Sequence, residues 1–285
     1  MERELVKSWR DGFKSDFGFI AVQLPGYLGD CGTYDQCMAE LPAMRLQQQA
    51  GLEGFGSASG PMTTLTPTYD LGCPFGVKTD ACPWGSVHNV NKRPVGARIA
   101  SQIIAGGKLG RGEREGNLGH GVAGNRQGAG GERHQFPGPA LVSVHANASS
   151  ASSAISTITV TFDGPVVQKP TANCAACCSQ GNVGDFDASF DGGKTWVNGT
   201  RPGNARSYAD GVVQFEVVAA EAADSVTHVR YVFNQAFPQC AIYSASAAPW
   251  PSPAAAVTSA SLFGSIPAMP FSVPLSENGA WKNAE

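Results

Sequence analysis

An almost uninterrupted apolar run, Phe-Gly-Phe-Ile-Ala-Val-Gln-Leu at residues 17–24, constrains the fold of this chain more than any other feature. A short apolar run that does not alternate with polar residues is typical of a strand buried on both faces of a parallel sheet. Before it, Leu5, Trp9 and Phe13 recur at helical spacing and predict a helix over residues 2–13 with one face packed on a core.

The residues that follow continue this alternation of helix and strand. We expect a helix that begins at Pro42 and runs to about Ala50, and a Thr-rich strand at residues 63–71. A third helix is predicted from Pro94 to Gly106, because apolar residues recur there at helical spacing, at Val95, Ile99, Ile103 and Ile104. Helices that alternate with strands indicate an α/β domain, which we place at residues 1–108.

The composition changes after this domain. Residues 109–136 are dense in glycine and are expected to form a linker. Beyond it, short β-branched or alternating runs separated by Gly, Asn and Ser predict an antiparallel β-sandwich domain at residues 137–275. Its expected strands are at 140–144, 155–162, 185–190, 212–218 and 226–233, with a hairpin turn at Asp191-Gly-Gly-Lys-Thr-Trp196. Residues 276–285 are expected to be a frayed tail.

Cysteines and glycosylation sequons indicate an oxidising compartment. The chain has eight cysteines, and two pairs of them, Cys31 with Cys37 and Cys73 with Cys82, bracket short loops, which favours disulfides. The sequence does not fix their pairing. Sequons at Asn147 and Asn198 agree with a secreted protein or one in an endomembrane, lysosomal or vacuolar lumen.

Charge and hydropathy argue against other classes of partner. A formal net charge of −3 without a basic block argues against nucleic acid or an anionic membrane as the main partner. No apolar run approaches the length of a membrane span. Cys174 and Cys177 form a lone CxxC without a second pair or paired histidines, so neither a metal site nor a cofactor is predicted.

One loop carries the strongest candidate for a catalytic group. His88 follows a turn built around Pro83 and Gly85 and precedes the helix that starts near Pro94. A histidine held in this way can act as a general base, since its ordinary pKa lies near neutral pH. The alternative that the local pattern leaves open is a surface loop with an incidental histidine.

The order of several motifs resembles the sialate O-acetylesterase family of SGNH-type carbohydrate esterases. In the first half these motifs are Trp9-Arg10, Val22-Gln23-Leu24, Arg45 with Gln48, Met62 with Asp70-Leu71, Gly85-Ser-Val-His-Asn-Val-Asn-Lys92 and Gly96-Ala-Arg98. In the second half they are Gly138-Pro139, Cys177-Cys178-Ser179, Val229-Arg230-Tyr231, Gln239-Cys-Ala-Ile-Tyr243 and Pro267-Ala-Met-Pro-Phe271. The resemblance covers nearly the whole chain and rests on the order and spacing of the motifs.

The resemblance implies a hydrolase that removes O-acetyl groups from sialic acid or related sugars with a serine nucleophile, a histidine base and an acid. His88 matches the histidine. Asp80 is the nearest candidate for the acid, with a loop-capping role as its alternative, because Gly85 and Ser86 stand where many relatives carry the aspartate. No serine here matches the nucleophile, which the family places before the Trp-Arg helix. We therefore expect the serine block upstream of Met1 and an inactive 285-residue chain.

Two other hypotheses remain open. An esterase of the same architecture could act on acetylated plant or algal polysaccharide. A non-catalytic carbohydrate-binding or scaffolding protein would use the β domain instead, with sugar-stacking platforms at Trp84, Trp196, Tyr243 and Trp250, although the pattern of a lone aromatic favours a core or hairpin residue. In the esterase readings the expected partner is an acetylated sugar or glycan. The sequence leaves the oligomeric state open.

Overall fold

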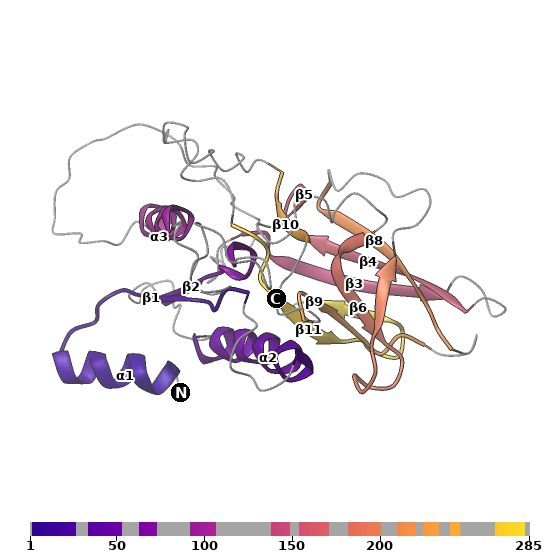
Figure 1. Ribbon diagram of the computed structural model, residues 1–285, viewed down its shortest axis with the longest axis horizontal. Coiled ribbons are helices and arrows are strands. Elements are labelled where there is room, and N and C mark those ends of the chain that lie inside the picture. The colour runs from indigo at the N-terminus through magenta and orange to yellow at the C-terminus, as the bar shows by residue number, and fades with distance from the viewer. Residues whose placement is uncertain are drawn as a thin grey trace.

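The computed structural model describes residues 2–26, 34–52, 63–72, 92–106, 138–148, 154–170, 182–200, 210–220, 225–233, 240–245 and 266–282. Helices and two short strands form the first part of the chain, and strands form the second (Figure 1). The elements of the first part are α1 (Glu2–Phe13), β1 (Phe19–Val22), α2 (Tyr34–Leu52), β2 (Thr63–Thr66), the 3₁₀ turn η1 (Tyr69–Leu71) and α3 (Arg93–Gly106). Those of the second part are β3 (Leu141–Ala148), β4 (Ile155–Phe162), β5 (Val166–Pro170), β6 (Asn182–Ser189), β7 (Val197–Thr200), β8 (Val212–Val218), β9 (His228–Tyr231), β10 (Cys240–Ser244), β11 (Phe271–Pro274) and β12 (Ala280–Lys282).

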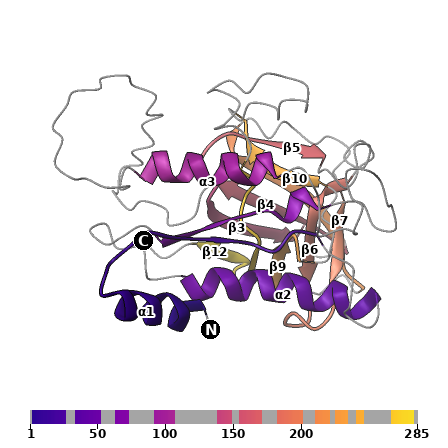
Figure 2. The same cartoon turned by 60° about the vertical axis from the view of Figure 1, so that its left-hand side comes forward.

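The first part contains a parallel pair of strands, as expected, but the prediction that the apolar run at residues 17–24 is buried on both faces is wrong, because Val22 of β1 is 42% exposed. β1 and β2 run side by side in parallel, with Phe19 opposite Thr63 and Val22 opposite Thr66. α3 lies on one face of this pair, and α1 and α2 lie on the other (Figures 1 and 2). A small apolar core fills the second face and consists of Val6, Leu52 and Leu65, with Phe19, Ala21 and Met269 packed against it.

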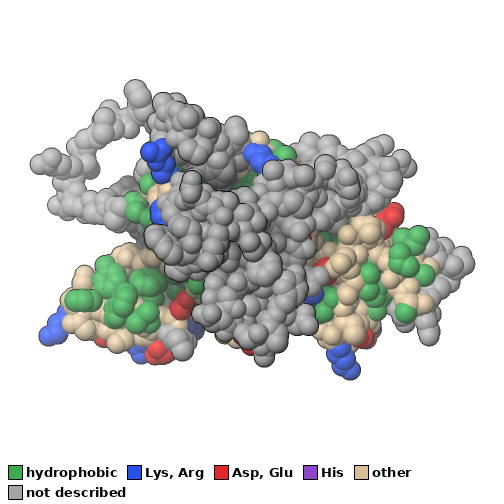
Figure 3. All heavy atoms as spheres, in the orientation of Figure 1, with side chains coloured by type: hydrophobic (Ala, Val, Ile, Leu, Met, Phe, Trp, Pro, Cys, Tyr) green, Lys and Arg blue, Asp and Glu red, His purple; other side chains and the backbone are tan. Residues whose placement is uncertain are grey.

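α1 has the predicted bounds, but the prediction that its apolar stripe packs on a core is wrong. The three residues of the stripe are exposed, Leu5 at 41%, Trp9 at 45% and Phe13 at 72%. Val6 is fully buried instead. The guanidinium of Arg10 donates to the Phe17 carbonyl at 3.0 Å and to the Thr63 hydroxyl at 2.7 Å. Trp9 keeps one contact with the strands, an edge contact with the Phe19 ring at a centroid distance of 5.9 Å. Figure 3 shows the resulting group of apolar side chains on α1.

α2 begins earlier than predicted. We expected Pro42 in the first turn of this helix, whereas the helix starts at Tyr34 and Pro42 lies inside it. Proline inside a helix removes one backbone hydrogen bond and costs about 3 kcal/mol, so local propensity favours a helix start at this position. Neighbouring elements outweigh that preference, since α2 packs against both α1 and β2.

The second part of the chain is an antiparallel β domain, as predicted. Eight strands form one sheet in the order β11-β9-β6-β7-β8-β4-β3-β12, and β5 and β10 form a separate antiparallel pair. β4 and β8 occur at their predicted residues, and the buried side chains alternate along both strands. The predicted hairpin turn at Asp191–Trp196 connects β6 to β7.

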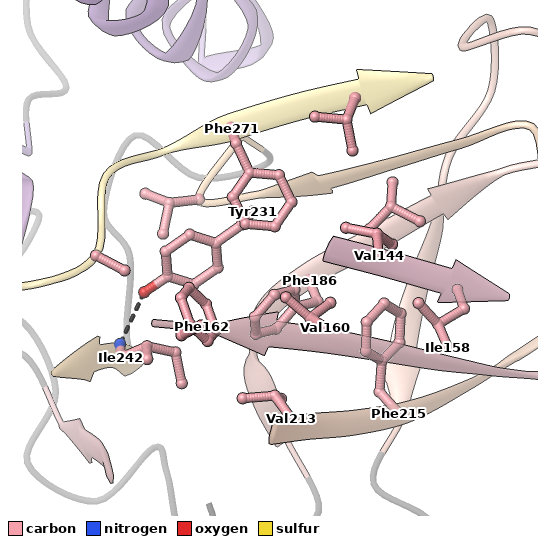
Figure 4. Close-up of a cluster of buried hydrophobic side chains, with 14 of the residues drawn as sticks. Val144, Ile158, Val160, Phe162, Phe186, Val213, Phe215, Tyr231, Ile242 and Phe271 are labelled. Atoms are coloured by element: carbon pink, nitrogen blue, oxygen red, sulfur yellow. Dashed lines mark hydrogen bonds between the residues drawn. The ribbon is translucent and has the colours of Figure 1, made fainter. Parts of the chain in front are cut away.

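The inner face of the sheet closes around one aromatic core (Figure 4). Phe186 of β6 lies at its centre, with ring centroids 5.2 Å from Phe215 of β8, 4.7 Å from Tyr231 of β9 and 6.3 Å from Phe271 of β11. Because side chains from strands far apart in the sheet meet in this cluster, the sheet is strongly curved and nearly barrel-like. Tyr69 of η1 belongs to the same cluster, so the two parts of the chain share a core.

The expected frayed tail is wrong for the residues that the structure describes. β12 pairs with β3, with Trp281 opposite Val144, and Trp281 packs on the apolar core. Gly279 has a φ of +70° and allows the turn before this strand, where a side chain would meet the Ala146 carbonyl oxygen.

Candidate functional site

The carboxyl ends of β1 and β2 lie at the same edge of the parallel pair, because parallel strands run in one direction. Ligands of open α/β sheets bind at this edge. Beyond β2, the Thr68 hydroxyl donates a hydrogen bond to the backbone carbonyl of Gln23, which follows β1. The backbone N–H of Gln23 donates to the Thr66 carbonyl at 2.8 Å. The chain then enters η1, which carries Tyr69 and Asp70.

Asp70 and Arg98 form a buried ion pair at this edge. Arg98 Nη1 lies 2.7 Å from Asp70 Oδ1, Arg98 Nη2 lies 2.6 Å from Oδ2, and both side chains are only 1% exposed. Arg98 Nη1 also donates to the Pro67 carbonyl at 2.6 Å. Burial alone lowers the pKa of Arg98, but the charge of Asp70 and its hydrogen bonds outweigh burial and raise that pKa above its ordinary value. Arg98 is therefore a cation held in a bidentate clamp by Asp70.

The β domain contributes to the same clamp. Tyr243 of β10 donates its hydroxyl hydrogen to Asp70 Oδ2 at 2.6 Å. Burial, followed by the negative charge of Asp70, raises the pKa of Tyr243 well above its ordinary value, so the phenol stays protonated and remains a donor. One carboxylate thus accepts hydrogen bonds from α3 and from β10.

A second contact between η1 and the β domain lies next to the first. The Tyr69 hydroxyl donates to the Ala268 carbonyl at 2.8 Å and lies 3.2 Å from the Tyr231 hydroxyl. Because Tyr69 has one hydroxyl hydrogen, Tyr231 is the donor between the two phenols. The Tyr231 oxygen in turn accepts the Ile242 backbone N–H at 2.7 Å. Burial raises the pKa of both phenols, so neither ionises near neutral pH.

The end of β1 is tied to α2 by polar side chains. Arg45 donates from Nε to the Leu24 carbonyl and from Nη2 to the Pro25 carbonyl, each at 3.0 Å. Burial lowers the pKa of Arg45 to about 10, so it is still a cation near neutral pH. Gln48 accepts the Leu24 N–H at 3.1 Å. The carboxamide of Gln23 is fully buried, and it makes no hydrogen bond to any residue that the structure describes.

The predicted base and acid, His88 and Asp80, lie outside the described residues. The structure describes the residues on either side of the segment that contains them. Residues 73–91 follow Gly72, two positions after Asp70, and precede Lys92, six positions before Arg98. The Asp70–Arg98 clamp therefore joins a residue that precedes this segment to a residue of the helix that follows it.

The sequence motifs included Asp70, Arg98 and Tyr243, but they predicted no contact among these three residues. Asp70 and Arg98 are 28 residues apart and Asp70 and Tyr243 are 173 apart, so no local pattern predicts their contact. The sequence did contain one signal for the ion pair: an acidic residue follows a strand, and a basic residue lies in the next helix.

Of the two alternatives for Tyr243, the core residue is confirmed and the sugar-stacking platform is excluded, because Tyr243 is 4% exposed and its hydroxyl is bonded to Asp70. Trp196 is half-buried on the outer face of the sheet, with the Arg230 guanidinium carbon 3.9 Å from its ring centroid. Trp84 and Trp250 lie outside the described residues.

Two further observations concern cysteines and metals. Cys240 of β10 is fully buried and disulfide-bonded, and its pairing rests on residues outside the described ranges. Among the described residues, no group of three or more His, Cys, Asp or Glu side chains is placed to hold a metal ion.

None of the described helices is long and apolar enough to cross a membrane.

No protein-family model matches the chain, and no curated protein is significantly similar to it.

Proposed function

We propose that the chain is the histidine-bearing part of a sialate O-acetylesterase-like carbohydrate esterase. In this proposal the first part belongs to an SGNH-type α/β domain, and the β domain is a β-sandwich packed against it. His88 takes the proton from a serine nucleophile that attacks the acetyl carbonyl, and Asp80 orients the imidazole. The substrate is an O-acetyl group on sialic acid or a related acetylated sugar.

A single observation carries this proposal, the Asp70–Arg98 clamp at the carboxyl edge of β1 and β2. A buried bidentate ion pair holds its partners in one geometry, because the fork of the guanidinium matches the carboxylate. It joins Asp70, which precedes residues 73–91, to Arg98 in the helix that follows them, at the edge where α/β sheets bind ligands, and this supports a base on that segment. A general base requires such placement, since it must lie within hydrogen-bond reach of the proton that it removes.

The same proposal includes a secreted or lumenal location. The disulfide at Cys240 supports it, because disulfides persist in oxidising compartments. Both sequon asparagines, Asn147 of β3 and Asn198 of β7, are exposed and accessible to a glycan. Treatment with an N-glycosidase should lower the apparent mass of the protein made in a secretory pathway.

The test is acetyl-ester hydrolysis by this chain and by the longest form of the protein that its gene encodes. The substrates are 4-nitrophenyl acetate and O-acetylated sialic acid. We expect His88→Ala to lower kcat/KM at least hundredfold in the active form, since loss of a general base has an effect of about this size. His145→Ala in β3 is the matched control and should keep the wild-type rate. Hydrolysis by His88→Ala within a few-fold of wild type would remove His88 from the reaction.

A non-catalytic carbohydrate-binding protein is the second candidate, and Trp196 is the described residue that favours it. Its ring is half-buried on the outer face of the sheet, next to the charged pair Arg230–Asp187, where a sugar could stack on the indole and bond polar groups. Saturable glycan binding that Trp196→Ala abolishes, without hydrolysis by any form of the protein, would favour this candidate over the esterase.

A further inference from the structure

We infer that Trp196 and the guanidinium of Arg230 form a binding site for the carboxylate of an acidic sugar on the outer face of the sheet. The inference rests on glycan binding at Trp196, the second candidate function above, and it names the class of glycan that this surface fits. It does not depend on ester hydrolysis by any form of the protein.

One end of the Arg230 guanidinium is fixed and the other is open. Arg230 of β9 lies opposite Asp187 of β6, and its Nε donates to Asp187 Oδ2 at 2.8 Å. None of the described residues accepts a hydrogen bond from Nη1 or Nη2. The side chain is 10% exposed, and both Nη nitrogens keep contact with solvent. This end of a guanidinium presents two parallel N–H donors, which match the two oxygens of a carboxylate.

Two aromatic rings hold the guanidinium in place. Its carbon lies 3.9 Å from the centroid of the Trp196 ring and 5.2 Å from that of Phe233. The Trp196 ring is itself fixed, because its indole N–H donates to the Gly193 carbonyl at 3.0 Å. A ligand therefore meets donors that are already ordered, and it does not have to immobilise a long side chain when it binds.

The open donors favour a charged ligand over a neutral one. A hydrogen bond from a guanidinium to a carboxylate is roughly twice as strong as one between neutral groups. The exposed part of the half-buried Trp196 ring lies beside these donors and offers an apolar surface to the C–H face of a sugar. A sugar that carries a carboxylate fits both features, whereas a neutral sugar fits only the ring.

The carboxylates next to this surface are already engaged. Asp187 is paired with Arg230, and Asp191 accepts hydrogen bonds from the N–H and the hydroxyl of Thr195 within its own turn. Lys194 is exposed in the same turn and adds a positive charge. The repulsion that an acidic ligand would meet from the two aspartates is therefore offset by two cations.

The experiment is an NMR titration that follows the indole ¹H–¹⁵N resonance of Trp196, assigned from a Trp196→Phe variant. The probes are N-acetylneuraminic acid and D-glucuronic acid, each paired with its uncharged carboxamide, and acetate as a carboxylate without a sugar. We expect saturable shifts with at least one of the two acids, and binding about tenfold weaker for its carboxamide and for acetate. The acid that binds more tightly identifies the sugar.

Two variants separate the guanidinium fork from general charge. Arg230→Lys keeps a cation beside Asp187 and removes the fork, so it should weaken binding of the acid about tenfold while the far-ultraviolet circular dichroism stays unchanged. Lys194→Gln is the matched control, since it removes an exposed cation from the same turn, and it should change the affinity by less than about twofold.

Equal affinity for an acid and its carboxamide would overturn the inference and leave glycan binding at Trp196 standing. Binding of none of the probes would remove both. A loss in Lys194→Gln as large as that in Arg230→Lys would also overturn the inference, because the attraction would then come from charge without the fork. If Arg230→Lys does not fold, the comparison of acid with carboxamide in the wild-type protein decides alone.

Discussion

The hydroxyl of Tyr243 donates a 2.6 Å hydrogen bond to the carboxylate of Asp70, which lies 173 residues earlier in the chain. Asp70 is also the partner of Arg98, so the contact joins a strand of the β domain to the helix that follows the His88 segment. A polar contact of this kind inside a shared core has a consequence for stability. Each partner has been taken out of water, and each depends on the others to compensate that cost.

Removal of Asp70 should therefore be strongly destabilising. We expect Asp70→Ala to lower the free energy of unfolding by about 3–5 kcal/mol, since it leaves the buried charge of Arg98 uncompensated. The measurement is urea unfolding followed by tryptophan fluorescence. The double variant Asp70→Leu with Arg98→Met should recover part of the loss, because an apolar pair of similar volume has no charge to desolvate. A loss below about 1 kcal/mol in Asp70→Ala would contradict the fixed clamp described above.

Replacement of Gln23, in contrast, should increase the stability of the protein. Its carboxamide is fully buried and bonds none of the described residues, which costs about 1–3 kcal/mol for an unpaired polar group. Gln23→Leu should therefore raise the free energy of unfolding by about 1 kcal/mol, measured by the same unfolding assay. Gln48→Leu is the matched control and should be destabilising, since Gln48 accepts the Leu24 N–H. If Gln23→Leu is destabilising instead, the carboxamide has a partner among residues that the structure does not describe.

The sequence was sufficient to predict elements whose signal is local. β4 and β8 were predicted at their observed residues, because β-branched and apolar residues alternate along each of them. α1 and α3 were predicted within one residue of their observed bounds, and the first turn of α3 contains Pro94 as expected. In each case the pattern that predicts the element lies within the element.

Elements and contacts that depend on distant residues could not be predicted in this way. β12 is only Ala-Trp-Lys, and it is a strand because it pairs with β3. β10 was described only as a motif, although its Tyr243 reaches η1. The clamp of Asp70, Arg98 and Tyr243 likewise has no local signature. The predicted site residues His88 and Asp80 remain predictions, since they lie outside the described residues.

The exposed stripe on α1 leads to a third prediction. Phe13 is 72% exposed, so Phe13→Ser should change the free energy of unfolding by no more than about 0.5 kcal/mol. Val6 is fully buried in the core between α1, α2 and the strands, and Val6→Ala should cost about 2 kcal/mol. Thermal unfolding by circular dichroism distinguishes the two variants. A Phe13→Ser loss as large as that of Val6→Ala would show that the stripe is covered in the folded protein.

The hairpin turn between β6 and β7 should contribute to the acid sensitivity of the protein. The Asp191 carboxylate accepts the Thr195 N–H at 2.9 Å, the Thr195 hydroxyl at 2.7 Å and the Ser189 hydroxyl at 2.8 Å. These bonds, with those from Thr195 the largest cause, hold the pKa of Asp191 well below its ordinary range. An aspartate with a lowered pKa stabilises the fold above its unfolded-state pKa of about 3.9. That contribution is lost as the pH falls below this value toward the folded-state pKa.

Replacement of Asp191 should therefore remove a pH dependence as well as a set of hydrogen bonds. We expect Asp191→Asn to unfold at a lower urea concentration than wild type at pH 7, and the difference between the two proteins should shrink as the pH falls toward 2. The reason is that wild type loses the benefit of the charged carboxylate over this range, while the variant has none to lose. Asp11→Asn, an exposed aspartate on α1, is the control and should follow wild type at every pH. A gap between Asp191→Asn and wild type that stays constant from pH 7 to pH 2 would show that the charge of Asp191 does not stabilise the hairpin.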